Sequence, residues 1–368
     1  MCITAPCLSL NWSVFDIDLS QTLQEAVRQA SAQTQPLTIR GGGSKAFYGR
    51  ATTPGQGLEV AGHRGLIDYE PSELFITLRA GTPLRELEAQ LAEAGQMLPF
   101  EPPHFGAHAT IGGTLACGFS GPRRPYAGAG RDFVLGTRIL NGRGEILRFG
   151  GQVMKNVAGY DLSRLMVGAL GTLGVILDVT LKVLPRPPCE ITLVQESDAA
   201  TAIRQMNRWP GQPVRLSATA YDGERLYVRL AGAETAVRVA QAQIGGELLP
   251  AADRFWQSLR EQEHPFFQGE EPLWRIAVAP ASPPLPLDGQ TFIEWGGAQR
   301  WLRGEQDSKA LRRLAAAHGG HAGLFRGGPR SGEVFHPLAP SLLAVHQRLK
   351  KAFDPVGILN HGRLYAAF

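Results

Sequence analysis

Residues 39–45 read Ile-Arg-Gly-Gly-Gly-Ser-Lys and continue a short run at 37–40 that predicts a β-strand. A strand that runs into three glycines lets successive backbone N–H groups point into one concavity, which suits a pyrophosphate. The glycine spacing is that of neither a dinucleotide-binding G-x-G-x-x-G loop nor a P-loop, so both of these motifs are excluded. A triple glycine alone is more often a flexible turn. The loop by itself therefore leaves both interpretations open.

Two further regions are rich in small residues. The first contains Ala-Thr-Ile-Gly-Gly at 109–113, Ser-Gly-Pro-Arg-Arg-Pro at 120–125 and Arg-Asp-Phe-Val-Leu-Gly at 131–136. The second contains Lys-Asn-Val-Ala-Gly-Tyr-Asp at 155–161 and Gly-Thr-Leu-Gly-Val-Ile at 171–176. Glycine accounts for 44 of 368 residues, against an average share of roughly 7%. This excess predicts main chain that packs closely against a flat, wide ligand.

Apolar periodicity predicts the elements around these motifs. Helical spacing occurs at 19–30 and 84–91, with Thr82 as the expected N-cap of the second helix. Strands are predicted at 74–78, 133–140, 145–149 and 175–183, the last with one buried face. Pro-Arg-Pro-Pro at 185–188 predicts a domain boundary. Beyond it we expect strands at 191–195, 214–221, 225–230, 273–278 and 291–295, helices at 199–209, 235–244 and 252–259, and a last helix over 342–353.

The ordered set of motifs resembles the vanillyl-alcohol-oxidase (PCMH-type) FAD-binding family. The C-terminal Asp-Pro-x-Gly-Ile-Leu-Asn-x-Gly at 354–362 resembles the flavin-contacting tail of the same family. Within the family, residues 120–125 and 148–161 are similar to the FAD-binding subunits of glycolate oxidase. The resemblance implies an α+β fold with a bipartite PCMH-type FAD-binding domain, residues 1–188 and 340–368, around a smaller α/β cap at 189–339.

The resemblance also implies roles for matching residues. The glycine loop would cradle the pyrophosphate, the second and third regions would lie against the flavin, and Asn360 would contact it from the C-terminal side. The alternative for each glycine is a tight turn, and for Asn360 a helix stop. The implied cofactor-binding residues are Arg40, Gly41, Gly42, Gly43, Ser44, Lys45, Thr110, Gly112, Gly113, Gly118, Gly121, Gly171, Thr172, Gly174, Val175, Ile176 and Asn360.

Comparison of this sequence with the motifs of the resembled family also bears on the mode of FAD binding and on the catalytic residues. Some related flavoproteins tether FAD through a His just after the glycine loop. Ser44 and Lys45 occupy that stretch, which implies non-covalent FAD. The candidates for catalysis are Lys155, His104 and Arg124, because a cation near the flavin stabilises the reduced ring and a guanidinium can bind a carboxylate. Surface solubility or a protein contact is the alternative for the two cations.

No metal site is expected. Relatives that oxidise 2-hydroxy acids directly tend to carry Gly-His-x-Gly-Asp-Gly-Asn-x-His, whose histidines hold a metal, and nothing in this chain fits it. His318 and His321 lack the Asp and Asn and suit a helix end, while His104 and His108 are flanked by residues that disfavour a helix. We therefore expect the isolated chain to oxidise glycolate slowly or not at all.

Composition limits the partners. The net charge of +4 is spread along the chain, so nucleic-acid binding is not expected. The four cysteines are scattered and cannot hold an iron–sulfur cluster, and no segment approaches 18 apolar residues. The resemblance implies a small 2-hydroxy-acid substrate such as glycolate, a homologous FAD-linked catalytic subunit and an iron–sulfur subunit. It also implies a cytoplasmic protein that reaches the inner membrane only through these partners. A self-sufficient FAD-dependent dehydrogenase and a structural subunit without catalysis remain the alternatives.

Overall fold

A five-stranded antiparallel sheet lies at the centre of the first half of the chain in this computed structural model, which describes residues 16–151 and 161–368. The strand order is β3-β4-β8-β6-β7. The strands span Leu66–Glu70 (β3), Phe75–Arg79 (β4), Val134–Leu140 (β6), Ile146–Gly150 (β7) and Val175–Lys182 (β8). The sequence patterns predicted β4, β8 and the β6–β7 hairpin to within two residues.

The middle strand β8 is buried on both faces, although its pattern predicted one buried face. Its apolar residues at 175, 177, 179 and 181 pack into the hydrophobic core. The other face is polar but paired. Asp178 lies 3.2 Å from the buried His63 Nε2 and also accepts a hydrogen bond from Arg138, and the hydroxyl groups of Thr180 and Thr77 are 3.0 Å apart. Paired polar groups can be buried at little cost, which the alternation rule does not include.

Short helices surround this sheet. They span Ser20–Ala32 (α1), Leu84–Glu93 (α2), Ile111–Cys117 (α3), Arg124–Ala127 (α4) and Leu162–Leu165 (α5). The prediction that Thr82 caps α2 is wrong, because Pro83 occupies the N-cap position. The Thr82 hydroxyl instead accepts a hydrogen bond from Gly65 N at 3.0 Å and lies 3.2 Å from Gly65 O. A buried hydroxyl takes the tertiary partner that is within reach.

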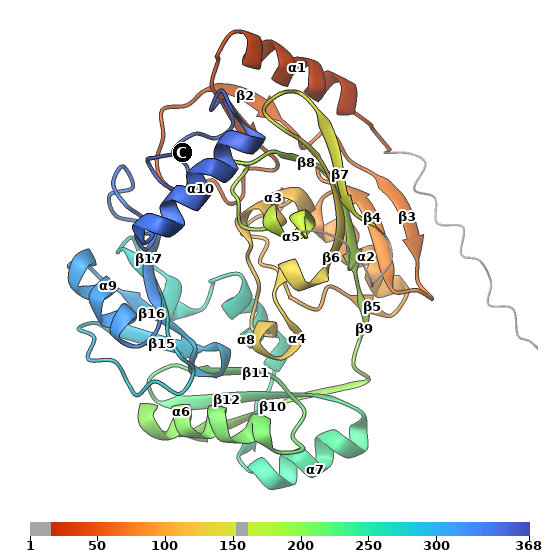
Figure 1. Cartoon of the computed structure of the whole chain (residues 1–368). Helices are drawn as coiled ribbons and strands as arrows, with labels where there is room; N and C mark the ends of the chain where they lie inside the picture. Colours follow the sequence, from red (N-terminus) through yellow and green to blue (C-terminus); the bar gives the residue numbers. More distant parts are fainter. Residues whose placement is uncertain (1–15, 152–160) are drawn as a thin grey trace, which may run out of the picture.

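The C-terminal segment returns to the beginning of the chain. Strand β1 (Leu37–Arg40), which was predicted, pairs in parallel with β2 (Gln56–Glu59). On its other side Leu37 N donates to Ile358 O at 2.7 Å, and Asn360 N donates to Leu37 O at 3.2 Å. Helix α10 (Pro340–Phe353) leads into this segment, and it is the long blue helix of Figure 1. The domain limits after residues 188 and 339 stay a prediction.

An eight-stranded antiparallel sheet follows. Its order is β13-β10-β12-β11-β15-β16-β14-β17. The strands span Cys189–Glu196 (β10), Leu216–Tyr221 (β11), Arg225–Gly232 (β12), Glu247–Leu248 (β13), Leu273–Ala277 (β14), Gln290–Glu294 (β15), Gln299–Arg303 (β16) and His321–Arg326 (β17). The helices that accompany it span Ala199–Arg208 (α6), Glu234–Ile244 (α7), Ala252–Arg260 (α8) and Ser308–Ala317 (α9). Figure 1 shows α6 and α7 below the strands β10 and β12.

The sequence patterns missed β13, β16, β17 and α9. Strand β16 contains two arginines, which weakened its apolar alternation. Arg300 is nevertheless buried, because its guanidinium donates to Gly297 O at 2.6 Å and to Ser282 O at 3.0 Å. His318 forms the C-cap of α9, as its glycine-rich context predicted. A two-stranded pair, β5 (Gln96–Met97) and β9 (Leu184–Pro185), lies on the path between the two large sheets.

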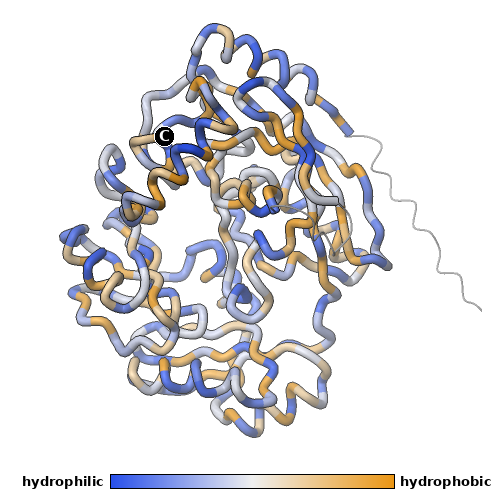
Figure 2. Tube along the Cα trace, viewed as in Figure 1, coloured by the Kyte–Doolittle hydropathy of each residue, from blue (hydrophilic) through white to orange (hydrophobic). Residues whose placement is uncertain are grey.

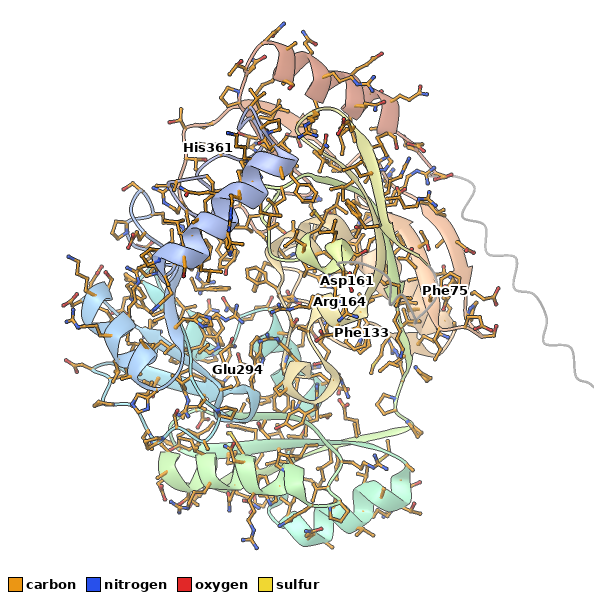
Figure 3. The ribbon with its side chains drawn as sticks, viewed as in Figure 1. Phe75, Phe133, Asp161, Arg164, Glu294 and His361 are labelled. Carbon is orange, nitrogen blue, oxygen red and sulfur yellow. The ribbon has the colours of Figure 1, made fainter. Side chains whose placement is uncertain are left out.

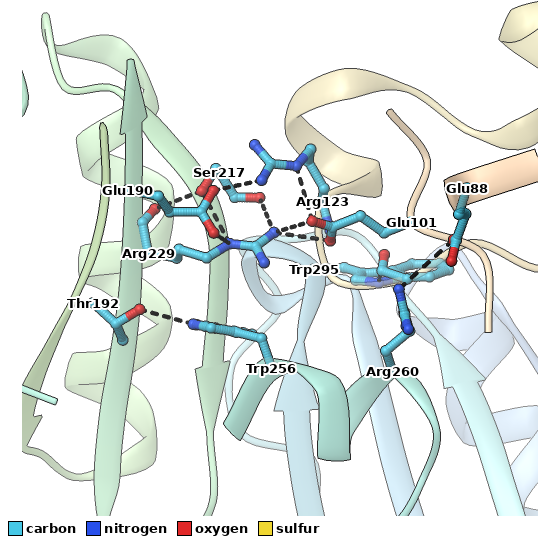
Figure 4. A network of polar contacts seen from close by, with 11 residues as sticks. Glu88, Glu101, Arg123, Glu190, Thr192, Ser217, Arg229, Trp256, Arg260 and Trp295 are labelled. Carbon is cyan, nitrogen blue, oxygen red and sulfur yellow. Dashed lines mark hydrogen bonds and ion pairs between the residues drawn. The ribbon is translucent and has the colours of Figure 1, made fainter. Parts of the chain in front are cut away.

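Alternating charges join the two parts of the chain (Figure 4). Glu101 accepts hydrogen bonds from Arg123 Nε at 3.0 Å and from Arg229 of β12 at 2.8 Å. Glu190 of β10 in turn accepts from Arg123 at 2.5 Å and lies 3.6 Å from Arg229. Burial alone would raise the pKa of Glu101, but the two guanidinium groups hold it below its usual value. Each charge in this network therefore has a partner of opposite sign.

The described residues contain neither a membrane-spanning helix nor a cluster of metal-binding side chains. None of the described helices combines the length and apolar character needed to cross a bilayer. No group of three or more His, Cys, Asp and Glu side chains in residues 16–151 and 161–368 is arranged to hold a metal ion. Figure 2 shows that apolar segments gather in the interior strands, whereas the outermost helix α1 is largely hydrophilic.

Candidate functional site

A cavity of about 690 Å³ lies beside the glycine loop. It is lined by the end of β1, by the loop that follows it, by α3, by the start of β8 and by the C-terminal segment. Its size is that of a cofactor site. Most of the residues that the sequence predicted for cofactor binding line it, namely Arg40, Gly41, Gly42, Gly43, Ser44, Lys45, Thr110, Gly112, Gly113, Gly171, Gly174, Val175, Ile176 and Asn360.

The backbone amides of the glycine loop face this cavity unpaired. None of the amide groups from Gly41 to Lys45 donates a hydrogen bond to a described residue. The loop turns only afterwards, where Ala46 N donates to Gly43 O at 3.0 Å. Consecutive free N–H groups at a cavity wall bind an anion such as a pyrophosphate. This is the strongest sign of a phosphate-bearing ligand in the structure.

The three glycines of the loop serve different purposes. A Cβ atom on Gly42 would lie 1.4 Å from His108 O, and one on Gly41 would lie 2.6 Å from Thr110 Oγ1. Both glycines are therefore required by the close packing of the loop on residues 108–110. Gly43 has open space around it but a φ of +73°, which only glycine adopts without strain. Close packing against other parts of the protein and a positive φ are therefore reasons for these glycines besides the predicted approach to a ligand.

Lys45 ends the loop with a buried ammonium group. Only 7% of the residue is exposed, and Nζ donates to His104 O at 3.0 Å and lies 3.3 Å from Ser44 Oγ. Burial lowers the pKa of Lys45 to about 8, although Cys117 and Glu261 nearby favour the charged form. A buried cation with neutral acceptors at the wall of a cavity suits an anionic group of the ligand.

The small residues of α3 pack against the sheet. Gly112 N donates to Ala80 O at 2.8 Å, and a Cβ atom at Gly112 would lie 2.6 Å from the Ala80 Cβ. Thr110 caps the helix and accepts from Gly113 N at 3.2 Å. The amides of Gly112 and Gly113 are thus used inside the protein. These residues shape the cavity wall rather than supply free donors.

Asn360 fastens the C-terminal segment to the cavity wall. Its Oδ1 accepts from Ile39 N at 2.9 Å, and its Nδ2 donates to Leu170 O at 2.7 Å. A Cβ atom on Gly171 would lie 2.7 Å from Nδ2, so this glycine makes room for the amide. Asp354 holds the preceding turn and accepts from three backbone amides between residues 357 and 359. The tail motif at 354–362 therefore acts as a clasp that fastens the C-terminal segment to the cavity wall.

Three predicted cofactor residues lie away from the cavity. Gly118 ends α3 at a φ of +67° and packs against Gly168. Gly121 contacts the backbone of Glu101, where a Cβ would lie 2.2 Å from the carbonyl oxygen. Thr172 is buried, and its carbonyl accepts from Lys350 Nζ at 2.8 Å. Each has a structural reason that is visible only once the distant segments are in place.

Neither of the two candidates for catalysis that the structure describes lines the cavity. His104 Nε2 lies 2.9 Å from Glu88 Oε2, and the residue is not part of the cavity lining. Arg124 stacks on Trp295 instead. Lys155 lies outside the residues that the structure describes. The described geometry therefore provides a binding site without a recognised acid–base pair beside it.

Several cavity residues had no signal in the sequence. Arg363 donates to Ala46 O and Tyr48 O, and Arg50 donates to Gly362 O at 2.7 Å, which ties the loop after the glycines to the C-terminal segment. Cys117 also lines the cavity, and burial raises the pKa of its thiol to about 11. Figure 3 shows His361, another lining residue, near the end of α10.

Comparisons with known proteins identify the family of this chain. Residues 17–150 match the family of FAD-binding domains. The chain is 50% identical over 351 residues to the glycolate oxidase subunit GlcE of Escherichia coli, which covers 95% of this chain and 99% of that protein. It is 31% identical over 160 residues to the glycolate oxidase subunit GlcD of Bacillus subtilis, covering 43% of this chain and 34% of that one.

Solved structures share the fold. A p-cresol methylhydroxylase structure superposes with a TM-score of 0.72 at 14% identity and covers 95% of this chain and 88% of that one. An alkyldihydroxyacetonephosphate synthase gives a TM-score of 0.64 at 15% identity and covers 92% and 74%. The predicted α+β fold with a PCMH-type FAD-binding domain is thus confirmed.

Proposed function

The chain belongs to the family of the glycolate oxidase subunit GlcE, and we propose that it binds FAD as one subunit of a complex that oxidises glycolate or a related 2-hydroxy acid. The observation that carries the proposal is the row of unpaired amides from Gly41 to Lys45 at the wall of a cofactor-sized cavity. FAD supplies two-electron redox chemistry when bound, while the protein binds, orients and tunes it.

The residues around the cavity fit FAD in chemistry and shape. The loop amides and the Lys45 ammonium group would hold the negatively charged pyrophosphate region. Gly171 and Gly174, which have no side chains, and the apolar residues Val175 and Ile176 at the start of β8 would lie along the flat parts of the cofactor. We propose these roles for the lining residues that the sequence predicted. For the polypeptide we propose the division 1–188 and 340–368 for FAD binding and 189–339 for the cap.

Non-covalent attachment is part of the proposal. No His follows the glycine loop, and the Cys117 thiol is held protonated by burial, so it is a poor nucleophile at neutral pH. Retention of FAD then depends on the clasp held by Asn360 and on the hydrogen bond from Arg363 to the loop after the glycines.

Partners complete the proposed reaction. His104 is paired with Glu88 and is therefore not free to serve as a base, while Arg124 stacks on Trp295, and neither candidate lines the cavity. We propose that a homologous FAD-linked subunit carries the 2-hydroxy-acid site and that an iron–sulfur subunit accepts the electrons. The complex would be cytoplasmic and would reach the inner membrane only through those partners.

Two measurements test the proposal. The purified chain should show a flavin spectrum, and acid should release all FAD, leaving no flavin fluorescence on the denatured polypeptide. The chain should also raise glycolate oxidation when added to its partner subunits, whereas a variant with Gly42→Val should not. A colourless chain that takes up no FAD, or a complex equally active without this chain, would contradict the proposed function.

A further inference from the structure

Helix α10 carries an apolar stripe that the rest of the described chain leaves largely exposed. The periodicity that predicted this helix runs through Leu342, Val345, Leu349 and Phe353. Of these four side chains only Phe353 is buried, and Leu349 is half-buried. Leu342 and Val345 are 46% and 47% exposed. A stripe of this kind normally packs into the core of its own protein. Its exposure is therefore the opposite of what the sequence pattern predicts.

A different row of residues holds α10 against the protein. The buried Lys350 ammonium group donates to Thr172 O at 2.8 Å and to Leu359 O at 2.7 Å. The ring of Phe353 lies 6.4 Å from that of Phe149. The helix is thus anchored by a buried cation and an aromatic ring, and the apolar stripe lies beside this inner face instead of forming it.

Exposed apolar side chains are concentrated at this helix. Seven large apolar residues of the described chain are exposed, and Leu342, Val345 and Val356 are three of them. Val356 is 41% exposed and lies two residues beyond Asp354, the C-cap of α10. Figure 1 shows α10 at the edge of the molecule. Single exposed apolar residues are ordinary on a protein surface, whereas a group of them marks an interaction site.

The spacing of the stripe suits packing against another helix. Three and four residues alternately separate Leu342, Val345, Leu349 and Ala352, which is the spacing of the a and d positions in packed helices. The stripe extends for about 15 Å along the helix axis, or nearly three turns. A helix with apolar residues at the same spacing would bury it.

The charges of α10 indicate that this helix is acidic. No Asp or Glu occurs between residues 340 and 353, and the exposed cations of the helix are Arg348 and Lys351. Neither forms an ion pair with a described residue, whereas Lys350 is paired with Asp354 inside the protein. The helix dipole favours cations in the last turn, which explains Lys351 but not the apolar stripe. A second copy of α10 would bring the same cations and no carboxylate to neutralise them.

We propose that the apolar stripe of α10 is the docking surface for a helix of a different protein chain, which has apolar residues at its a and d positions and Asp or Glu beside them. Association would remove the exposed parts of Leu342 and Val345 from water and pair Arg348 with a carboxylate. That the different chain is a subunit of the 2-hydroxy-acid-oxidising complex rests on the proposed function, whereas the chemistry of the docking helix does not.

The test measures binding of the full-length, FAD-loaded chain to the purified FAD-linked and iron–sulfur partner subunits by biolayer interferometry. Val345→Glu should raise the Kd by about tenfold or more, because an apolar contact is lost and an unpaired charge is buried. The matched control is Val239→Glu in α7, where the valine is 66% exposed. This control should change the Kd by less than about twofold.

A second pair of variants tests the charge of the partner. Arg348→Glu should raise the Kd by about fivefold or more at low ionic strength, and the effect should shrink in about 1 M salt because exposed charges are then screened. Lys309→Glu reverses an exposed cation of α9 and should leave the Kd within about twofold of the wild-type value. Equal effects of the two reversals would show that the partner is attracted only by the net charge of the chain, which would contradict an acidic helix on α10.

Equal Kd values for the Val345→Glu and Val239→Glu variants, or a wild-type chain that binds neither subunit, would overturn the docking surface. Wild-type dimers that Val345→Glu dissociates would overturn it as well, because a second copy would then cover the stripe. Faster hydrogen exchange in α10 of the isolated chain after deletion of residues 1–15 would show that the chain covers its own stripe, which also contradicts the proposal.

FAD content and Tm report whether each variant is folded. If Val345→Glu loses FAD, Leu342→Gln makes a milder change in the same stripe and should still weaken association. An active complex with an unchanged Kd for Val345→Glu would refute this surface alone. A complex that Val345→Glu dissociates, but that oxidises no 2-hydroxy acid, would refute the proposed function and leave the docking surface standing.

Discussion

Replacing Lys45 with Met tests whether the ammonium group of the glycine loop binds an anionic part of FAD. In the FAD-free chain burial lowers the pKa of Lys45 to about 8, and the two acceptors of Nζ, His104 O and Ser44 Oγ, are uncharged. An anionic group of FAD would favour the charged form and raise this pKa again. Binding above pH 8 must then include the uptake of a proton, so the affinity for FAD should fall as the pH rises through 8.

The size of the effect follows from the pKa. At pH 9 only about a tenth of FAD-free chains carry the charge, so the Kd for FAD should be about tenfold higher at pH 9 than at pH 7, or about 1.4 kcal/mol. Lys45→Met should weaken binding at pH 7 and abolish the pH dependence. The stability of the FAD-free chain should change in the opposite direction. Because the unfolded chain holds the Lys45 proton to higher pH, the free energy of unfolding should rise with pH above about 8.

The assay is the quenching of FAD fluorescence on binding to the FAD-free chain at pH 7, 8 and 9. The control is Lys309→Met, which removes an exposed lysine of α9 and should keep the wild-type dependence on pH. A wild-type Kd that is constant from pH 7 to 9, or equal slopes for wild type and Lys45→Met, would refute this role of Lys45.

Three further outcomes are expected. Gly42→Val should abolish FAD binding and lower the Tm, because the new Cβ would meet His108 O. Gly43→Ala has free space around it, so it should keep FAD and lower the free energy of unfolding by only about 1 kcal/mol. Equal FAD contents in the two variants would show that the loop packs differently. Asn360→Ala removes two hydrogen bonds to the cavity wall, so it should lower the free energy of unfolding by about 1–3 kcal/mol and weaken FAD binding. Urea titration measures the first effect and equilibrium dialysis the second. Unchanged values in both assays would disprove the clasp. Under anaerobic conditions glycolate should leave the flavin band of the isolated chain unbleached and bleach it only after the partner subunits are added, and rapid bleaching of the chain alone would make this subunit the catalytic one.

Much of the fold could be predicted because it depends on local patterns. Strand β1, the β6–β7 hairpin and five strands of the eight-stranded sheet have apolar residues at the period of a strand, flanked by glycines and prolines. The departures occur where polar side chains are buried in pairs, as with Asp178 in β8 and Arg300 in β16. The partners of these polar side chains come from distant segments, so the local sequence period does not predict that the side chains are buried.

The candidate site, too, could be predicted from the sequence only in part. The ordered motifs predicted the class of fold and of cofactor through their resemblance to a known family, and the glycines among them predicted main chain that packs closely against its surroundings. Which glycine faces the ligand and which one faces His108, Asn360 or Glu101 was decided only by tertiary structure. The clasp from Arg363 to the loop at 46–50 and the stacking of Arg124 and Arg275 on Trp295 join segments that are far apart along the chain. Such contacts arise from the packing of the whole molecule, and a single sequence carries no periodic trace of them.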